Sequence, residues 1–315
     1  MAMEEDLEWE LVIIGGGPAG MTAAIYGARY GLKTVLLESR VLGGAQATSP
    51  GIENYPGFSF IMGIELANRM KEQVKKCGAN IREITEVKSI KTEENGSFVL
   101  ETRRGDYNAK AIILATGGEY RKLHVPGEDE YTGQGVSYCA TCDGPLFREK
   151  VIAVVGGGNT AVTEALYLKD LATKVYLIHR RDELRAEQAV QDMLFDSDIE
   201  ILWSHVVKEF KGENLLSEIV LENLKNGEVS SLVVDGAFVA LGSEPQNKLA
   251  VELAVEMNER GEIIADAHQA TNLPGVFAAG DVVESLKQIA VAVGQGAIAA
   301  DSAYSFIRGV KLGPR

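Results

Sequence analysis

Two cysteines separated by two residues carry the clearest signal for chemistry in the sequence. Cys139 and Cys142 form a C-x-x-C motif, and Asp143 follows directly. This spacing is typical of disulfides that open easily and of thiols that ionise readily, and a neighbouring carboxyl group can give and take protons. The motif therefore predicts a dithiol–disulfide site with Cys139, Cys142 and Asp143 as its catalytic residues.

The cysteine pair could also be a metal site or part of the core. A zinc site uses cysteine pairs, but it needs two further ligands. The third cysteine, Cys77, is isolated, and the 4 histidines show no paired spacing, so we expect no metal. The pair could also be inert core residues, since free cysteine is often buried. We expect Cys77 to lie near a helix end and assign it no function.

A glycine-rich loop lies between two expected strands near the start of the chain. The apolar run 11–14 leads into this loop, an expected helix covers 21–30, and the strand 34–37 ends at Glu38. Strand, G-x-G-x-x-G, helix, strand and acid form the dinucleotide-binding fingerprint, in which the acid binds a ribose. The residues expected to approach a pyrophosphate at the helix N-terminus are Gly15, Gly17, Pro18, Ala19 and Gly20.

The same order recurs in the middle of the chain. The strand 151–155 leads into Gly156-Gly157-Gly158-Asn159-Thr160-Ala161, a helix is expected over 160–171, and the strand 174–178 follows. Ala161 replaces the third glycine, and alanine is small enough for close packing of helix on strand.

The second copy ends in basic residues instead of an acid. His179 stands as far along the chain from Gly156 as Glu38 does from Gly15. Basic side chains at this position favour a ribose 2′-phosphate, so we expect NADPH rather than NADH. The expected ligands of NADPH are Gly156, Gly158, Asn159, Thr160, His179, Arg180, Arg181 and Arg185.

Two later segments are expected to complete the first nucleotide site. The strand 111–115 is followed by Thr116 and Gly117, and the strand 275–279 is followed by Gly280 and Asp281. A carboxylate in this position can bind a ribityl or ribose hydroxyl, although Asp281 could equally cap a turn or helix. The alanine-rich stretch 288–307 is expected to be a helix whose N-terminus faces the electron-rich edge of a reduced flavin.

Because these segments flank the second glycine loop, we expect one discontinuous domain with another inserted into it. The predicted fold class is α/β, with two Rossmann-like nucleotide-binding domains, each with a three-layer ββα arrangement. The FAD-binding domain is expected to cover 1–120 and 246–315, and the NADPH-binding domain 121–245 with the C-x-x-C motif. The crossings are expected near 119–123 and 243–248, where the chain turns polar.

Composition narrows the class of partner. The chain has 315 residues and a formal net charge of −14. Such an acidic surface disfavours nucleic acid and anionic membranes as partners. The sequence has no apolar run of about 18 residues and does not begin like a signal peptide, so we expect a cytoplasmic protein.

Taken in order, the motifs resemble those of the low-molecular-weight thioredoxin reductases, over essentially the whole chain. They are G-G-G-P-A-G, Gly43-Gly44-Ala45-Gln46, Glu53-Asn54-Tyr55-Pro56-Gly57, C-A-T-C-D, G-G-G-N-T-A, H-R-R-D-E-L-R and A-A-G-D. The most specific feature is the cysteine motif beside the second glycine loop. In the relatives lipoamide dehydrogenase and glutathione reductase the redox pair follows the first loop, and here 41–57 contains no cysteine.

The resemblance implies a set of roles. It extends the FAD site to Gly44, Gln46, Asn54, Thr116, Gly117, Gly280, Asp281, Gln288, Ile289 and Ala290. It implies that Cys142 faces the flavin, that Cys139 attacks the substrate disulfide, and that Asp143 protonates the leaving thiolate. The partner would be thioredoxin, or a thioredoxin-like or glutaredoxin-like protein. The resemblance also implies a homodimer, and an inserted domain that rotates between two orientations.

The sequence departs from the family pattern at two places. Asn159-Thr160 replaces the more usual acid–serine pair, and Lys287 stands where arginine is common. We expect these changes to retune nucleotide affinity rather than abolish binding.

Three alternative functions compare less well with the sequence. Reductases of peroxiredoxin systems carry a long N-terminal extension, for which there is no room before Gly15. Relatives that use ferredoxin or a deazaflavin have abandoned NADPH, whereas the basic residues of 179–185 are intact here. A redox sensor or inactive scaffold is disfavoured by the intact cysteine pair and Asp143. We therefore expect an NADPH-dependent flavoprotein disulfide reductase.

Overall fold

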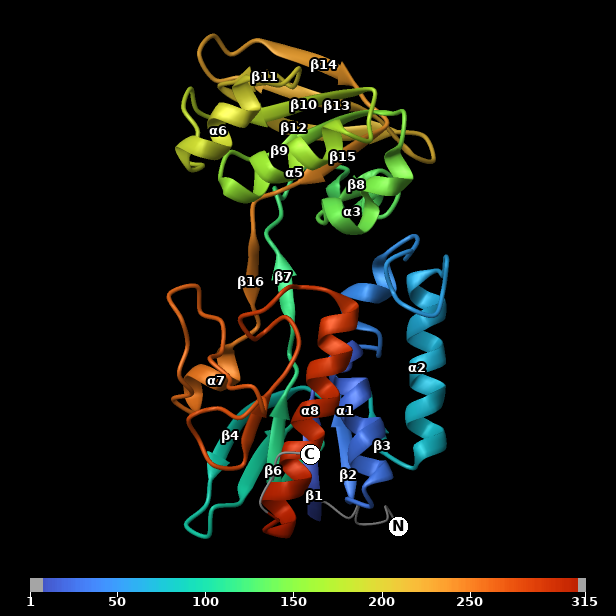
Figure 1. The fold of residues 1–315 in the computed structure, drawn as a ribbon, viewed down its shortest axis with the longest axis vertical. Helices are drawn as coiled ribbons and strands as arrows, with labels where there is room; N and C mark the ends of the chain where they lie inside the picture. Colours follow the sequence, from blue (N-terminus) through green and yellow to red (C-terminus); the bar gives the residue numbers. More distant parts are fainter. Residues whose placement is uncertain (1–7, 311–315) are drawn as a thin grey trace. The chain divides into compact units, whose positions relative to one another are not determined.

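The structure, a computed structural model, describes residues 8–310. The chain forms two compact units (Figure 1). Within the described residues, the first consists of 8–47, 55–119 and 244–310, and the second of Thr48–Asn54 and Tyr120–Ser243. Each unit is built around its own sheet, so each is described by itself.

A seven-stranded sheet forms the centre of the first unit, in the order β3-β2-β1-β6-β5-β4, with β17 also paired to β6. Its parallel strands are β1 (Glu8–Ile14), β2 (Thr34–Leu37), β3 (Asn80–Arg82), β6 (Gly105–Leu114) and β17 (Val276–Ala278). Two antiparallel strands, β4 (Val87–Thr92) and β5 (Phe98–Thr102), add to the first half of β6. The expected strand 111–115 is thus the second half of a longer strand.

Alternate residues of the central strands face opposite layers, as the two-residue period of a strand requires. Val12 and Ile14 pack into a core with the β4–β5 hairpin and with α7 (Lys248–Glu252). Leu11 lies on the other face, under Gly27 of the helix α1 (Pro18–Arg29). On this face α1 packs between α2 (Gly63–Cys77) and α8 (Ile289–Arg308), as Figure 1 shows.

The second unit has two sheets. A five-stranded parallel sheet has the order β11-β10-β9-β15-β8, and a three-stranded antiparallel sheet has the order β12-β13-β14. The parallel strands are β8 (Val136–Ser137), β9 (Val151–Val155), β10 (Lys174–His179), β11 (Glu200–Trp203) and β15 (Gly236–Val239). The antiparallel strands are β12 (His205–Gly212), β13 (Leu216–Asn223) and β14 (Val229–Val233).

Residue alternation along β9 again assigns the layers. Ile152 and Val154 pack with α5 (Asn159–Lys169), whereas Ala153 and Val155 share a core with β12 and β13. The order helix, parallel sheet, antiparallel sheet is the three-layer ββα arrangement. The predicted α/β class with two Rossmann-like domains is therefore confirmed. The remaining short elements of this unit are α3 (Glu128–Tyr131), α4 (Ala140–Asp143), η2 (Gly144–Phe147) and α6 (Gln188–Phe195).

Two short strands carry the chain between the units. They are β7 (Gly118–Tyr120) and β16 (Ser243–Pro245), and they pair with each other as a two-stranded sheet (Figure 1).

The long helices expected from the sequence are present with small shifts. They are α1, α5 and α8, and α1 starts at Pro18 because proline suits a first helical position. Cys77 ends α2, next to Gly78 in the left-handed conformation (φ 87°), so its expected place at a helix end is confirmed.

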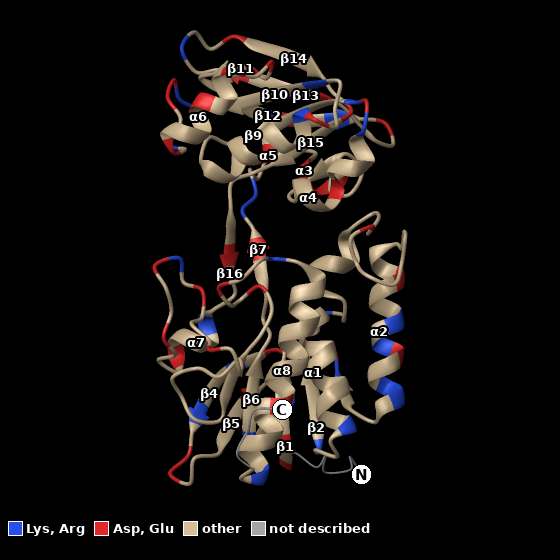
Figure 2. Ribbon diagram, viewed as in Figure 1, with Lys and Arg blue, Asp and Glu red and all other residues tan. Residues whose placement is uncertain are grey.

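Charged residues are distributed along the ribbons of both units (Figure 2). On α2, for example, Arg69 pairs with Glu65 at 2.6 Å, and Lys71 pairs with Glu83 at 2.7 Å. Within residues 8–310, no helix is long and apolar enough to cross a membrane.

Candidate redox centre and nucleotide-binding loops

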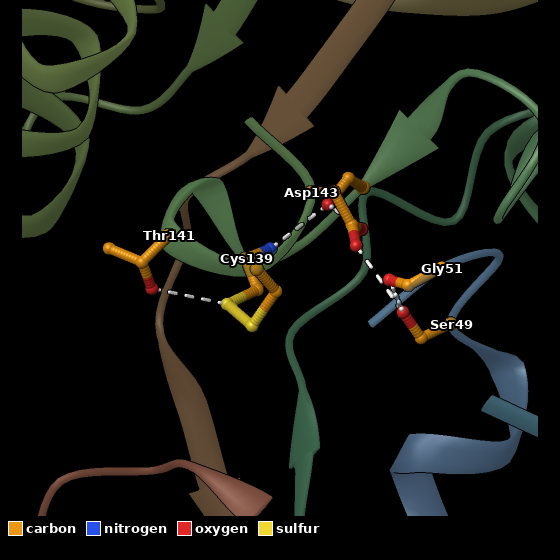
Figure 3. The surroundings of a disulfide bond; sticks show 7 residues. Ser49, Gly51, Cys139, Thr141 and Asp143 are labelled. Carbon is orange, nitrogen blue, oxygen red and sulfur yellow. Dashed lines mark hydrogen bonds between the residues drawn. A yellow bond between two sulfur atoms is a disulfide. The ribbon is translucent and has the colours of Figure 1, made fainter. Parts of the chain in front are cut away.

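Cys139 and Cys142 are joined by a disulfide in the second unit (Figure 3). The carbonyl oxygen of Cys139 accepts the N–H groups of Cys142 at 3.2 Å and of Asp143 at 3.1 Å, which closes the single turn of α4. This turn holds the two cysteine Cα atoms 5.3 Å apart, with both residues half-buried. The described residues contain no cluster of three side chains that could hold a metal ion.

Asp143 occupies the same turn, and its carboxylate is held by hydroxyl groups (Figure 3). Ser137 Oγ donates to Asp143 Oδ2 at 2.6 Å. Ser49 Oγ lies 3.4 Å from Asp143 Oδ1 and donates to the carbonyl of Gly51 at 3.0 Å. Burial raises the pKa of the Asp143 carboxyl group, and the hydroxyl groups of Ser137 and Ser49 offset part of this rise. A raised pKa suits a carboxyl group that must hold a proton for transfer.

A second carboxyl group lies behind the cysteine turn. The helix α5 packs against α4, and Glu164 of α5 accepts a hydrogen bond from the backbone N–H of Ala140. Burial raises the pKa of Glu164 to about 7, and its Oε2 atom is buried without a hydrogen-bond partner. No sequence motif points to Glu164. The one clue in the sequence is a charged residue on the helix face that Ala161 and Leu168 bury.

In the first glycine loop, two glycines serve internal packing and a third leaves space. A Cβ atom at Gly15 would overlap the carbonyl oxygen of Ala115, and one at Gly20 would overlap that of Gly15. At Gly17 the nearest atom would be 3.9 Å away. Gly17 is also the N-cap of α1, which no side chain caps. The helix N-terminus is therefore open to an anionic ligand.

The carboxylate of Glu38 lies against this loop. Its Oε2 accepts the N–H of Gly16 at 2.6 Å, and its Oε1 accepts the N–H of Arg40 at 2.7 Å. Ser39 Oγ also donates to Oε1, at 3.1 Å. A lone pair therefore remains on Oε2, where Glu38 can still accept a hydrogen bond from a ribose hydroxyl.

Segments far apart in the sequence meet at the first turn of α1. A Cβ atom at Gly44 would lie 2.9 Å from the Cα of Gly17, and one at Gly280 would lie 2.9 Å from the Cβ of Ala19. At Gly296 of α8 a Cβ atom would overlap the backbone oxygen of Ala19. These contacts bring the loop 280–281 and the helix α8 beside the glycine loop.

Two polar side chains near these segments fit a bound dinucleotide. Gln46 is 4% exposed, and its Oε1 atom has no hydrogen-bond partner. Burial raises the pKa of Asp281, and the positive charge of Lys287 lowers it in part. Within residues 8–310, no group donates a hydrogen bond to the Asp281 carboxylate. A buried amide oxygen and a partly buried carboxylate without donors match the hydroxyl and amide hydrogens of such a ligand.

Other residues predicted for the flavin site have different settings. Thr116 Oγ1 donates to the carbonyl of Gln246 at 2.6 Å, and the carbonyl of Gly117 accepts the N–H of Gln246 at 2.9 Å. Asn54 is exposed and belongs to the second unit. Gln288 is the N-cap of α8, and Ile289 and Ala290 begin that helix.

In the second glycine loop, as in the first, one glycine packs against neighbouring atoms and another leaves open space. A Cβ atom at Gly158 would meet nothing within 4 Å, whereas one at Gly157 would overlap the ring of His179. His179 is only 5% exposed, its Nε2 lies 3.0 Å from the carbonyl of Glu183, and burial lowers its pKa. The imidazole therefore packs against the glycine loop as a neutral group.

The segment after β10 is tied to the glycine loop and to α5. The N–H of Arg185 donates to the carbonyl of Gly157 at 2.8 Å. Asn159 Oδ1 accepts the N–H of Glu187 at 2.7 Å, and Asn159 Nδ2 donates to Glu187 Oε1 at 3.0 Å. Thr160 is the next, exposed residue of α5.

Three arginines of this segment are exposed. Asp182 of this segment forms an ion pair with Lys225 at 3.0 Å. Arg180, Arg181 and Arg185 form no ion pair within the described part of the chain. They are therefore available to a phosphate group near the glycine loop.

Comparison with known proteins decides the family. The protein-family model described as pyridine nucleotide-disulphide oxidoreductase matches residues 9–296. The chain belongs to this family. As a member of it, the chain is an oxidoreductase that uses a flavin and a pyridine nucleotide together with a disulfide.

This pyridine nucleotide-disulphide oxidoreductase has relatives of nearly equal length. Thioredoxin reductase from Bacillus subtilis (strain 168) is 43% identical over 313 residues, which are 97% of this chain and 96% of the relative. A Clostridium pasteurianum protein described as a 34.2 kDa protein in rubredoxin operon is 40% identical, over 98% of this chain and 100% of the relative. The crystal structure of thioredoxin reductase from Streptococcus pyogenes MGAS5005 is 42% identical with a TM-score of 0.92, over 97% of this chain and 100% of that one. The resemblance to the low-molecular-weight thioredoxin reductases is confirmed.

Proposed function

We propose that this oxidoreductase is an NADPH-dependent thioredoxin reductase. It carries electrons from NADPH through FAD and the Cys139–Cys142 disulfide to the disulfide of thioredoxin. The observation that carries the proposal is the disulfide closed within one turn beside the acid Asp143. The relatives named thioredoxin reductase, which match nearly the whole chain, support this choice of substrate.

In this proposal FAD binds the first unit and NADPH the second. Gly17 and the first turn of α1 hold the FAD pyrophosphate, Glu38 holds its ribose, and Gln46 and Asp281 take further polar groups of the cofactor. When bound, the nicotinamide supplies a hydride to the flavin, and the flavin supplies the electron pair that opens the disulfide.

For NADPH, Gly158 leaves room for the pyrophosphate at the start of α5. Arg180, Arg181 and Arg185 hold the 2′-phosphate, because guanidinium groups bind phosphate through paired hydrogen bonds. His179 supports the loop from behind rather than touching the phosphate, since its ring is buried against Gly157.

The reduced cysteines then exchange with the partner protein. The thiolate of Cys139 attacks one sulfur of the partner disulfide, and a mixed disulfide forms as the partner's other sulfur leaves. Asp143 supplies the proton that this leaving thiolate takes up. Cys142 next attacks the Cys139 sulfur, and the second partner sulfur leaves. This sulfur takes up the proton that Cys142 loses, and the Cys139–Cys142 disulfide is restored. Two electrons and two protons thus pass to the partner.

We also infer a homodimer in the cytoplasm. A disulfide that cycles with small thiol proteins belongs in a reducing compartment, and the thioredoxin reductase resemblance supports the dimer. Light scattering of the purified flavoprotein at several concentrations would test the oligomeric state, and a monomer at every concentration would overturn it.

The assay that tests the function measures NADPH oxidation with a bacterial thioredoxin, with a glutaredoxin and with neither. We expect turnover with thioredoxin, its loss in C139S and C142S, and its retention in C77S, because Cys77 is a free thiol of α2 in the other unit. Turnover with glutaredoxin alone would transfer the proposal to that partner. Full turnover in either C139S or C142S would refute the disulfide mechanism.

A further inference from the structure

One hydroxyl group joins the acid of the redox turn to the backbone of the first cysteine. Ser137 Oγ donates to Asp143 Oδ2 at 2.6 Å, and the same oxygen accepts the N–H of Cys139 at 3.1 Å. A serine hydroxyl has one hydrogen and two lone pairs. In this arrangement its hydrogen goes to the carboxylate and one lone pair goes to the cysteine amide.

The backbone fixes this hydroxyl firmly. Ser137 ends β8, where it pairs in parallel register with Phe238 of β15, and it is 4% exposed. The turn on the other side is equally constrained, because the carbonyl of Cys139 accepts the N–H groups of Cys142 and Asp143. Cys139 is therefore held at its N–H by Ser137 and at its carbonyl by α4.

We propose that Ser137 is a positioning residue for the disulfide exchange. It fixes the Asp143 carboxyl group relative to Cys139, and it sets the pH range in which Asp143 delivers its proton. The proposal rests on the role of Asp143 in the proposed function. Ser137 donates its hydrogen to the ionised carboxylate, and a short donor bond of this kind stabilises the charged form against the cost of burial.

Ser137 is the nearest hydrogen-bond donor to the Asp143 carboxylate. Ser49 reaches the second carboxylate oxygen at 3.4 Å, but its hydroxyl hydrogen has a closer acceptor in Gly51 at 3.0 Å. Ser137 and Asp143 line a cavity of about 280 Å³ together with the exposed, charged residues Lys150 and Asp235. Because those two residues are exposed, the cavity gives protons access to Asp143 from solvent.

The remaining ionisable groups on the packed elements are few. The helix α5 contributes Glu164, whose carboxyl group contacts the amide of Ala140. The turn itself contributes Cys139 and Cys142, which titrate once they are reduced. No charge on these groups accounts for the raised pKa of Asp143. Burial raises it, and the hydroxyl groups of Ser137 and Ser49 offset part of the rise.

The test compares S137A with the wild-type protein across pH. The enzyme is reduced with NADPH and mixed with a bacterial thioredoxin, and the rate of dithiol formation on thioredoxin is followed at each pH. The variant D143N identifies the limb of this profile that belongs to Asp143. We expect S137A to move that limb upward by about one pH unit, because loss of the donor destabilises the ionised carboxylate. A residue that only stabilised the fold would lower the rate at every pH without moving the limb.

Two variants serve as controls. S137T keeps the hydroxyl and should return the limb toward its wild-type position. Ser197 is a matched serine in the same unit: its Oγ donates at 2.6 Å to the carbonyl of Leu194 and accepts the N–H of Ile199 at 3.3 Å. S197A should therefore leave the limb in place. NADPH-driven bleaching of the flavin should be normal in every variant and shows that each has folded.

The outcomes separate the two proposals. If wild-type protein does not reduce thioredoxin, the proposed function fails. If wild-type protein does reduce it, but the limb stays in place in S137A or moves equally in S197A, the role of Ser137 is refuted while the function stands. If S137A does not fold, S137T decides: a limb that moves upward although the hydroxyl is present would refute the role, and an unchanged limb would support it.

Discussion

Glu164 offers a quantitative test of how the cysteine turn is supported. Its carboxyl group is partly buried on α5, accepts the N–H of Ala140, and has one oxygen without a partner. We expect E164Q to make the protein more stable at alkaline pH and to leave stability nearly unchanged at acidic pH. The glutamine retains an oxygen for the Ala140 amide but carries no charge to bury.

The size of the effect follows from the pKa. Burial raises the pKa of Glu164 from 4.5 to about 7, so the folded state holds this proton more tightly than the unfolded state. Wild-type stability is therefore unaffected by Glu164 below pH 4.5, falls as pH rises toward about 7, and stays lowered above that. At about 1.4 kcal/mol per pKa unit, the penalty relieved in E164Q is at most about 3.5 kcal/mol.

Urea unfolding at about pH 4.5 and about pH 8.5 would measure this difference. Circular dichroism can follow the unfolding transition of the flavin-loaded protein. E213Q is the control, because Glu213 is exposed in the turn between β12 and β13. A stability difference between E164Q and wild type that is the same at both pH values would refute the reasoning, as would an equal pH dependence in E213Q.

Three further predictions concern the cofactor loops and the cysteines. G17A should fold normally but bind FAD more weakly, because its Cβ atom enters the open space at the start of α1. G20A should destabilise the first unit, because its Cβ atom overlaps the backbone. Flavin retention and thermal unfolding would separate the two effects. R180A/R181A should lose roughly 1–3 kcal/mol of binding free energy per phosphate contact with NADPH, and none with NADH. Equal losses for both nucleotides in flavin-reduction kinetics would contradict the assignment. C142S should trap thioredoxin as a mixed disulfide visible on a non-reducing gel, and a trap formed only by the reciprocal variant would reverse the roles of the two sulfurs.

Local features of this molecule could be predicted from sequence because they depend on neighbouring residues. Gly15 adopts a positive φ of 109°, and such conformations favour glycine whatever the rest of the chain does. The apolar run 151–155 forms a strand with the predicted bounds. The two-residue spacing of the cysteines allows a disulfide between them, and Cys139 and Cys142 are joined by one.

The surroundings of these features could not be predicted, because they depend on contacts between distant segments. Ser49 and Ser137 meet Asp143 only through the fold, and Glu164 reaches the cysteine turn only because α5 packs against α4. The sequence predicts that His179 binds the nucleotide, yet its ring is buried against Gly157. The direction of a side chain at a strand end is set by such packing, which sequence spacing does not describe.

The central claim is that NADPH opens the Cys139–Cys142 disulfide, and counting thiols tests it most directly. The oxidised protein has one free cysteine, Cys77, and one disulfide. Alkylation under anaerobic conditions followed by mass spectrometry should find one modified cysteine before NADPH is added and, with FAD bound, all 3 cysteines of the chain afterwards. A count that stays at one after the flavin has been fully reduced would contradict the account.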